Sequence, residues 1–193
     1  EDIISWKKNN SRFTVAKTFI DLYIKKYTNN FYGLIIFAWE ALETLPFTSD
    51  AWIFNTILYW INNWNVSKYW TNLNAVFNSL NNYFSEEQKW WLAVILTDGW
   101  DEDIDISMEL VENLSKNEVK ILIIWIWNTK WAKIPIWKDF FWKNLYKTYE
   151  WKEVITKLNK NVLESISSKY NIEYVSLNNT NDFDKINNII TSN

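Results

Sequence analysis

The stretch of the chain that says most about its fold is Leu92-Ala93-Val94-Ile95-Leu96-Thr97-Asp98. Its first five residues are apolar without a break, which is typical of a β-strand whose two faces are both covered by other layers. Two further runs are similar: Tyr32–Ala38, and Val119–Trp127, in which Lys120 is the only charged residue. We therefore predict three buried strands, the arrangement found in parallel sheets.

Helical and strand patterns alternate along the rest of the chain. Helices are predicted where apolar residues recur at helical spacing, at Ser11–Tyr27, Ser49–Ile61, Asn72–Phe84, Ser107–Lys116, Asn161–Tyr170 and Asn181–Ile190. Two more strands are predicted at Glu173–Leu177 and at Leu42–Phe47, where Pro46 suits a sheet edge. Strands that alternate with helices form a mostly parallel sheet between helix layers, so the predicted class is α/β and Rossmann-like. Residues 1–193 show no repeat and no linker-like segment, which predicts a single domain.

The composition excludes several classes of site. Histidine and cysteine are both absent, which removes Ser-His-Asp and Cys-His nucleophiles, thiolate zinc sites and disulfides. Any bound metal must then be a hard cation held by oxygen, such as Mg²⁺ or Ca²⁺. The net charge of −3 and the pI of 5.1 argue against a nucleic-acid partner. No glycine-rich phosphate motif and no acid–base pair can be identified, so we expect no enzymatic activity.

Tryptophan is unusually frequent and glycine unusually rare. The chain has fifteen tryptophans and two glycines, whereas average usage of roughly 7 % predicts about 13 glycines. Trp64, Trp100 and Trp131 lie in polar turn strings, where the backbone calls for a residue that adopts positive φ without steric cost. We interpret the tryptophans as glycine positions, encoded by TGA codons that the source organism reads as glycine and that are translated here as tryptophan. Abundant lysine and asparagine beside a single arginine, Arg12, suggest an AT-rich genome and agree with this interpretation.

Six short strings along the chain form an ordered pattern. They are Ser11-Arg12-Phe13-Thr14-Val15-Ala16-Lys17, Gly33-Leu34-Ile35-Ile36-Phe37-Ala38-Trp39-Glu40-Ala41, Trp70-Thr71-Asn72-Leu73, Leu96-Thr97-Asp98-Gly99, Ile124-Trp125-Ile126-Trp127 and Trp151-Lys152-Glu153-Val154-Ile155-Thr156-Lys157-Leu158. In this order they resemble a von Willebrand factor type A (VWA) domain, most closely the bacterial membrane-anchored type encoded in aerotolerance operons. The family typically carries Phe-Ala-Gly-Glu-Ala, Gly-Thr, Thr-Asp-Gly and Ile-Gly-Ile-Gly at four of these places. Trp39, Trp70, Trp125 and Trp127 thus stand at family glycines, and the resemblance covers essentially the whole chain.

The resemblance implies a divalent-cation site, usually for Mg²⁺, at the carboxyl end of the sheet. In this family the metal-ion-dependent adhesion site (MIDAS) takes ligands from an Asp-x-Ser-x-Ser turn after the first strand, from a later threonine and from an aspartate after the fourth strand. Thr71 matches the threonine and Asp98 the aspartate. The Asp-x-Ser-x-Ser turn is not in the chain, and by the family layout it lies just before Glu1 together with the first, central strand. We therefore expect an N-terminally incomplete domain, with either a gap between Tyr32–Ala38 and Leu92–Thr97 or closure of these two strands on each other.

The resemblance also implies a function in protein binding. An acidic residue of a protein partner completes the coordination of the family's cation, and the parent protein lies in the cell membrane through flanking segments that are absent here. An AAA-type ATPase or other VWA membrane subunits are the implied partners. The 193 residues themselves are expected to be soluble, because their longest apolar run, Ile121–Trp127, is far below the roughly 20 residues that span a bilayer.

Two other functions stay open at this point. The chain could be a metal-independent, degenerate VWA scaffold that binds partners through its loops. Exposed tryptophans could instead bind carbohydrate or a membrane surface, although Trp90-Trp91 and Trp125-x-Trp127 touch strand ends rather than making one surface.

The individual residues also have simpler interpretations. Asp98 could be a turn residue and Thr71 a helix N-cap. Glu40 could line the rim of the site or lie on the surface. The acidic residues Asp101, Glu102, Asp103 and Asp105 are predicted to be solvated loop charge. They do not match a Ca²⁺ loop, because Ile106 stands where that loop needs glycine.

Overall fold

The structure is a computed structural model that describes residues 11–62, 71–84, 91–98, 106–126, 132–133, 135–138, 144–146, 148–149, 152–153, 155–156, 164, 167–170, 172–177 and 180–192. Its main helices are α1 (Arg12–Lys26), α2 (Ala51–Trp60), α3 (Leu73–Tyr83), α4 (Met108–Lys116) and α6 (Thr180–Ser192). Its longer strands are β1 (Tyr32–Phe37), β2 (Ala41–Thr48), β3 (Leu92–Thr97), β4 (Lys120–Ile126) and β11 (Glu173–Leu177).

These five strands form two separate groups. β11, β4 and β3 make a parallel sheet in that order, with Ile123 of β4 between Ile95 of β3 and Tyr174 of β11. β1 and β2 make an antiparallel pair, with Ile36 opposite Leu42. No ladder among the described residues joins β1 to β3. Closure of β1 and β3 on each other, one of the two predicted arrangements, is therefore not seen among the described residues.

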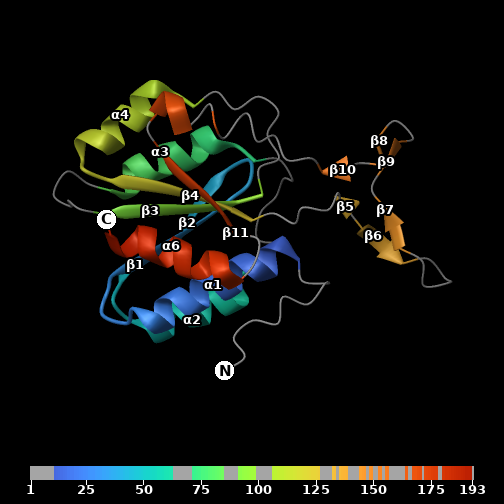
Figure 1. The fold of residues 1–193 in the computed structure, drawn as a ribbon, viewed down its shortest axis with the longest axis horizontal. Helices are drawn as coiled ribbons and strands as arrows, with labels where there is room; N and C mark the ends of the chain where they lie inside the picture. Colours follow the sequence, from blue (N-terminus) through green and yellow to red (C-terminus); the bar gives the residue numbers. More distant parts are fainter. Residues whose placement is uncertain are drawn as a thin grey trace.

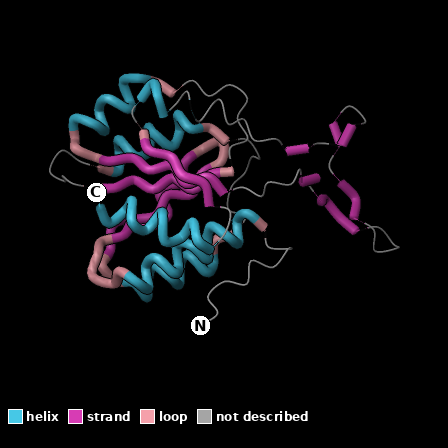
Figure 2. The backbone as a smooth tube through the Cα atoms, in the orientation of Figure 1, coloured by secondary structure: helices cyan, strands magenta, loops and turns pink. Residues whose placement is uncertain are grey.

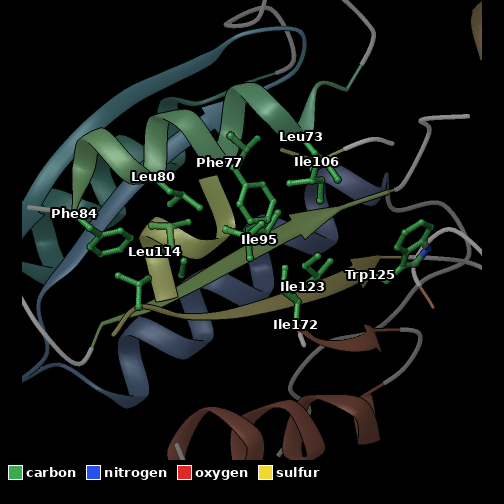
Figure 3. Close-up of a cluster of buried hydrophobic side chains, with 14 residues drawn as sticks. Leu73, Phe77, Leu80, Phe84, Ile95, Ile106, Leu114, Ile123, Trp125 and Ile172 are labelled. Atoms are coloured by element: carbon green, nitrogen blue, oxygen red, sulfur yellow. The ribbon is translucent and has the colours of Figure 1, made fainter. Parts of the chain in front are cut away.

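Helix layers cover both faces of the parallel sheet (Figures 1 and 2). On one face, Phe77 of α3 and Leu114 of α4 are fully buried in a cluster that contains Ile95 and Ile123 (Figure 3). On the other face, α1 and α6 pack over a second cluster that contains Ile124. Successive residues of β4 point to opposite faces, and both faces are covered, which is why its apolar run has no polar interruption.

The side chains of three N-cap residues start the first three helices. Ser11 Oγ accepts from the Thr14 amide at 3.1 Å. Asp50 Oδ1 accepts from the amides of Trp52 and Ile53 in α2, and Asn72 begins α3 in the same way. These residue types satisfy amide groups that have no partner within the helix.

β1 is less buried than predicted. Tyr32–Ala38 was expected to be covered on both faces like the central strands, but all six residues of β1 are only half-buried. The reason is that β2 flanks one edge of β1, while the other edge faces a cavity. An apolar run predicts that both faces of a strand are covered, but it does not predict whether another strand pairs with each of its edges.

The remaining predicted elements agree with the described residues. Each predicted helix or strand listed above that the structure resolves as an element lies within two residues of the observed bounds. Of the predicted helix Asn161–Tyr170, the described residues 164 and 167–170 are helical.

Six short strands had not been predicted. They are β5 (Ala132–Lys133), β6 (Pro135–Lys138), β7 (Asn144–Tyr146), β8 (Thr148–Tyr149), β9 (Lys152–Glu153) and β10 (Ile155–Thr156). They pair in antiparallel fashion as β5 with β10, β6 with β7 and β8 with β9, on the right of Figure 1. Runs of two to four residues are too short to show a strand period in the sequence.

Helix α4 ends in a Schellman motif whose left-handed residue is a glutamate. The Glu118 amide donates to Ser115 O, and the Val119 amide donates to Leu114 O, both at 3.0 Å. Glu118 has a φ of 57°, a conformation that glycine adopts without the steric cost of a Cβ.

Glu118→Gly is therefore expected to raise the free energy of unfolding by about 0.5–1 kcal/mol, despite the greater entropy of glycine in the unfolded chain. Urea denaturation with an unchanged m-value measures the effect. Glu112→Gly, at an exposed position within α4, is the control and should lower stability by about 1 kcal/mol. Destabilisation by both substitutions would contradict the prediction.

Candidate functional site

The carboxyl end of β3 meets the start of α3. Phe84, just after α3, packs against Trp91, just before β3, with ring centroids 5.9 Å apart. The end of α3 thus lies at the start of β3, so the two elements are antiparallel and α3 begins where β3 ends. Figure 3 shows the same relation, with Leu73 of α3 near the end of the sheet that carries Trp125.

The carboxyl end of β1 lies at this same end. The Asn72 amide, at the start of α3, donates to the carbonyl oxygen of Ala38, just after β1, at 2.8 Å. At the other end of α3, the Tyr83 side chain lies against Gly33 at the start of β1. Since β1 and β3 both run antiparallel to α3, they run parallel to each other.

Asp98 stands directly after β3 and is bound to the single arginine of the chain. Arg12 Nη1 lies 3.0 Å from Asp98 Oδ2, and the side chains are 29 % and 43 % exposed. Arg12 is the first residue of α1, so the pair places the start of α1 at the carboxyl end of β3. An exposed pair of this kind contributes about 1 kcal/mol or less to stability. The sequence analysis assigned no role to Arg12, although its being the only arginine was visible.

Thr71 is not the N-cap of α3. That position belongs to Asn72, whose Oδ1 accepts from the Ala75 amide at 3.2 Å. The simpler interpretation of Thr71 as a helix cap is therefore wrong. Thr71 is half-buried, immediately before the cap, and lines the same cavity as Asp98.

This cavity, of about 1210 Å³, lies between the two strand groups. The whole of β1 and the whole of β3 line it, together with side chains of α1 and α3. Arg12, Thr71 and Asp98 lie along its polar end, where β1 and β3 finish. The cavity thus extends from the two predicted site residues, Thr71 and Asp98, into the space between β1 and β3.

The sequence analysis also considered Glu40 and the acidic residues that follow Asp98. Glu40 is exposed in the turn after β1, and its carbonyl oxygen accepts from the Ala38 amide at 3.0 Å. That position is at the rim of the same end, on the surface. The acidic residues 101–103 and 105 lie outside the described residues.

The donors at this end suit a hard cation in kind but not in number. A carboxylate and a hydroxyl are the oxygen ligands that Mg²⁺ prefers, and Mg²⁺ takes about six ligands in octahedral geometry. Across the described segments of the chain, no group of three or more acidic, histidine or cysteine side chains is placed to hold a metal. The guanidinium of Arg12 already neutralises Asp98. The residues described here therefore do not hold a divalent cation by themselves.

No model of a known protein family matches the chain, and no curated protein matches it either. Solved structures do share its fold. The conserved hypothetical protein BatB from Bacteroides thetaiotaomicron superposes with a TM-score of 0.81 at 22 % identity, over 98 % of this chain and 92 % of that chain. An aerotolerance-related membrane protein from Bacteroides fragilis gives a TM-score of 0.80 at 23 % identity, over 99 % and 94 %.

A third similar structure belongs to an animal protein. Proximal thread matrix protein 1 from the mussel byssus, described with a zinc-occupied MIDAS motif, has a TM-score of 0.61 at 13 % identity, over 94 % of this chain and 42 % of that chain. Identities this low show the fold alone. The chain therefore shares the Rossmann-like α/β fold of these solved structures.

Proposed function

We propose that this domain binds a protein partner at the carboxyl end of its sheet, through a divalent cation such as Mg²⁺ that Thr71 and Asp98 help to hold. The observation that carries the proposal is the position of these two oxygen donors, at one end of the sheet and on one cavity. In open α/β sheets, ligands bind beyond the carboxyl ends of the strands. The shared fold with a protein described as carrying a zinc-occupied MIDAS motif supports the same place.

The remaining ligands would come from outside these 193 residues. We propose that the first strand of the fold and the Asp-x-Ser-x-Ser turn after it lie ahead of Glu1. When the turn supplies its oxygen ligands and the cation binds, the ion pair between Arg12 and Asp98 breaks, and the Asp98 carboxylate contacts the cation instead. Bound there, the cation offers a coordination position to an acidic side chain of the partner, while loops around it supply contact area. This function requires no enzymatic chemistry.

The cellular setting belongs to the same proposal. The similar protein from Bacteroides fragilis is described as a membrane protein, and we propose that the parent of this domain is anchored in the cell membrane beside an AAA-type ATPase or related VWA subunits. Among the described helices, none is long and apolar enough to cross a bilayer.

The cation proposal predicts a Mg²⁺-dependent gain in stability once the ligand set is complete. In a chain carrying a strand and an Asp-x-Ser-x-Ser turn fused ahead of Glu1, with glycine at the tryptophan positions, Mg²⁺ at 100 times its Kd is expected to add about 2.7 kcal/mol. Calorimetry and thermal unfolding with and without Mg²⁺ measure the effect.

Single substitutions test the two ligands in that chain. Asp98→Asn and Thr71→Ala should each weaken Mg²⁺ binding, whereas Glu40→Gln, at the exposed rim of the same end, should leave it unchanged. If Mg²⁺ produces no heat and no shift in the complete chain, and the two ligand variants behave like their parent, the cation is not bound here.

The contact between Arg12 and Asp98 favours a second candidate, the metal-independent scaffold. An arginine 3.0 Å from the carboxylate already supplies the positive charge that a cation would bring. In that case a partner binds the loops at this end of the sheet equally well in EDTA and in Mg²⁺. Binding measured in both buffers separates the two candidates.

Exposed aromatic residues on α2 support a third candidate, a carbohydrate or membrane surface. Trp52, Tyr59 and Trp60 are 75 %, 76 % and 72 % exposed. The rings of Tyr59 and Trp60, however, stand at 86° to each other. A sugar stacks on coplanar rings, so this pair does not form a flat platform.

A further inference from the structure

The short strands β5–β10 stand apart from the sheet, beyond its carboxyl end. β4 finishes at Ile126, and β5 begins at Ala132. β5 pairs with β10, so the first and last of these strands lie side by side, and β6–β7 and β8–β9 pair between them in the sequence. Figures 1 and 2 show these strands to the right of the sheet and its helices. We call β5–β10 the arm.

Positive charge is concentrated in the part of the sequence that contains the arm. Residues 130–160 have eight lysines and three acidic residues, which gives a net charge of +5. The rest of the chain has 12 basic and 20 acidic residues, which gives a net charge of −8. The overall charge of −3 is therefore the sum of two parts of opposite sign.

Three of these lysines lie on described strands of the arm. They are Lys133 on β5, Lys138 on β6 and Lys152 on β9. Their register partners on the neighbouring strands are Ile155, Asn144 and Tyr149. Residues directly opposite each other are the ones that interact most closely across a strand pair. In these ladders, then, no acidic residue stands at the position where it would neutralise one of the three lysines.

The end of the sheet beside the arm carries acidic residues. Asp98 follows β3, with a side chain 43 % exposed, and Glu40 is exposed in the turn after β1. A nucleic acid or an anionic bilayer is negatively charged over its whole surface, so it would attract the arm and be repelled by these carboxylates. A protein surface can place acidic residues against the arm alone. A protein with an acidic patch is therefore the partner that this distribution of charge fits.

We propose that the arm binds an acidic patch on the surface of a protein partner at the carboxyl end of the sheet. Attraction between the lysines and the carboxylates speeds association and selects partners by charge. Binding of an acidic polypeptide to the arm depends on the lysines alone. Only the further step, that the same acidic patch supplies the residue that reaches the cation, rests on the function proposed above.

The test uses the 193-residue chain and a synthetic twenty-residue peptide in which glutamate alternates with serine. A peptide with glutamine in place of glutamate is its uncharged control. Binding is measured by calorimetry in EDTA, so the result does not depend on whether the proposed cation is bound. Carbodiimide cross-linking of carboxylates to lysines, followed by mass spectrometry, locates the bound peptide.

Two triple variants with the same change in net charge are compared. The arm variant carries Lys133→Gln, Lys138→Gln and Lys152→Gln. The body variant carries Lys26→Gln, Lys116→Gln and Lys120→Gln, at three exposed positions outside the arm. A third variant with arginine at the three arm positions keeps the charge, and thermal unfolding of each variant beside the parent shows that it folds.

The glutamate peptide is expected to bind saturably and the glutamine peptide not to bind. The arm variant should bind at least roughly tenfold more weakly than the parent, which corresponds to about 1.4 kcal/mol. The body variant and the arginine variant should stay within about twofold of the parent. Binding should weaken from about 0.01 M to about 0.1 M salt, since the Debye length falls from about 30 Å to about 10 Å. Cross-links should lie within residues 130–160.

Equal binding by the arm and body variants, cross-links only to lysines outside the arm, or no binding of the glutamate peptide would each overturn the proposal. Two further probes test the class of partner, an oligothymidine of twenty nucleotides and vesicles of phosphatidylcholine with one third phosphatidylglycerol. If either binds the parent more tightly than the peptide does and loses that affinity in the arm variant, the partner is not an acidic protein. A failure of Mg²⁺ to bind the complete chain described above would contradict the cation and leave these results unchanged.

Discussion

Gly33→Ala is expected to lower the free energy of unfolding by about 2 kcal/mol, in the middle of the range that overpacking costs. A Cβ at Gly33 would overlap Tyr83 Oη and lie 2.7 Å from Tyr83 Cε1 and Cζ. The Tyr83 ring has little freedom to withdraw, because its hydroxyl donates to Leu45 O and its ring packs against Phe47 at 4.6 Å. A tyrosine hydroxyl is protonated at neutral pH and can donate, and burial raises the pKa of Tyr83 further, to about 12.

A double-mutant cycle isolates this contact. Tyr83→Ala removes the ring and is destabilising by itself, but in that background Gly33→Ala should cost almost nothing. The coupling between the two substitutions should therefore be close to the full 2 kcal/mol, within the range of about 0.5–3 kcal/mol that contacting residues show. Urea denaturation of the four proteins measures it. An equal cost of Gly33→Ala with and without the Tyr83 ring would show that space beside Gly33 is not what limits this position.

The sequence predicts this fold well where a residue's surroundings follow from its own strand or helix. Leu92–Thr97 and Glu173–Leu177 have the predicted bounds without change, because each is an apolar run or alternation that ends at polar residues. β1 was predicted to be buried and is only half-buried, since burial of a strand also depends on what lies along its edge. The strands between Ala132 and Thr156 are too short for any period to appear.

The candidate site was predictable in its position and not in its contacts. The resemblance to VWA domains placed Thr71 and Asp98 together at one end of the sheet, and the structure has both on one cavity. The pairing of Arg12 with Asp98 joins residues far apart in the chain, and no local pattern encodes such a contact. Thr71 and Asn72 are both good N-cap residues, so only the backbone geometry decides between them.

The exposure and hydrogen bonding of the tryptophan side chains bear on their interpretation as glycine positions. Trp39, Trp52 and Trp60 are 46 %, 75 % and 72 % exposed, whereas Trp125 is 3 % exposed. The buried indole nitrogen of Trp125 has no hydrogen-bond partner in the structure, although buried tryptophan usually finds one. Trp91 differs from these, since its ring packs against Phe47 at 4.0 Å. Exposed or unpaired indoles are what we expect where the folded chain evolved with glycine.

The glycine interpretation can be tested at Trp125 by comparing it with Phe77, a fully buried core residue. Phe77→Ala, at a fully buried position of α3, is expected to cost about 3–5 kcal/mol. Trp125→Gly is expected to cost less than about 2 kcal/mol, because it also removes a buried N–H without an acceptor, which itself costs about 1–3 kcal/mol. Its Cα partners on the neighbouring strands are Thr97 and Ser176, and its ring belongs to the buried hydrophobic cluster that also holds Phe77, so the two substitutions probe the same cluster.

Denaturation of the two variants beside the parent chain measures this contrast. Trp125→Phe is the third variant, since it keeps a large ring and removes only the N–H, and it should be at least as stable as the parent. A loss for Trp125→Gly as large as that for Phe77→Ala would mean that the indole belongs to the core, and the glycine interpretation would be wrong at this position. Mass spectrometry of the protein isolated from its source organism gives the independent answer, because each tryptophan replaced by glycine lowers the mass of its peptide by a fixed amount. Agreement between the two measurements at Trp125 would extend the interpretation to Trp39, which stands at the end of β1 beside the proposed binding site.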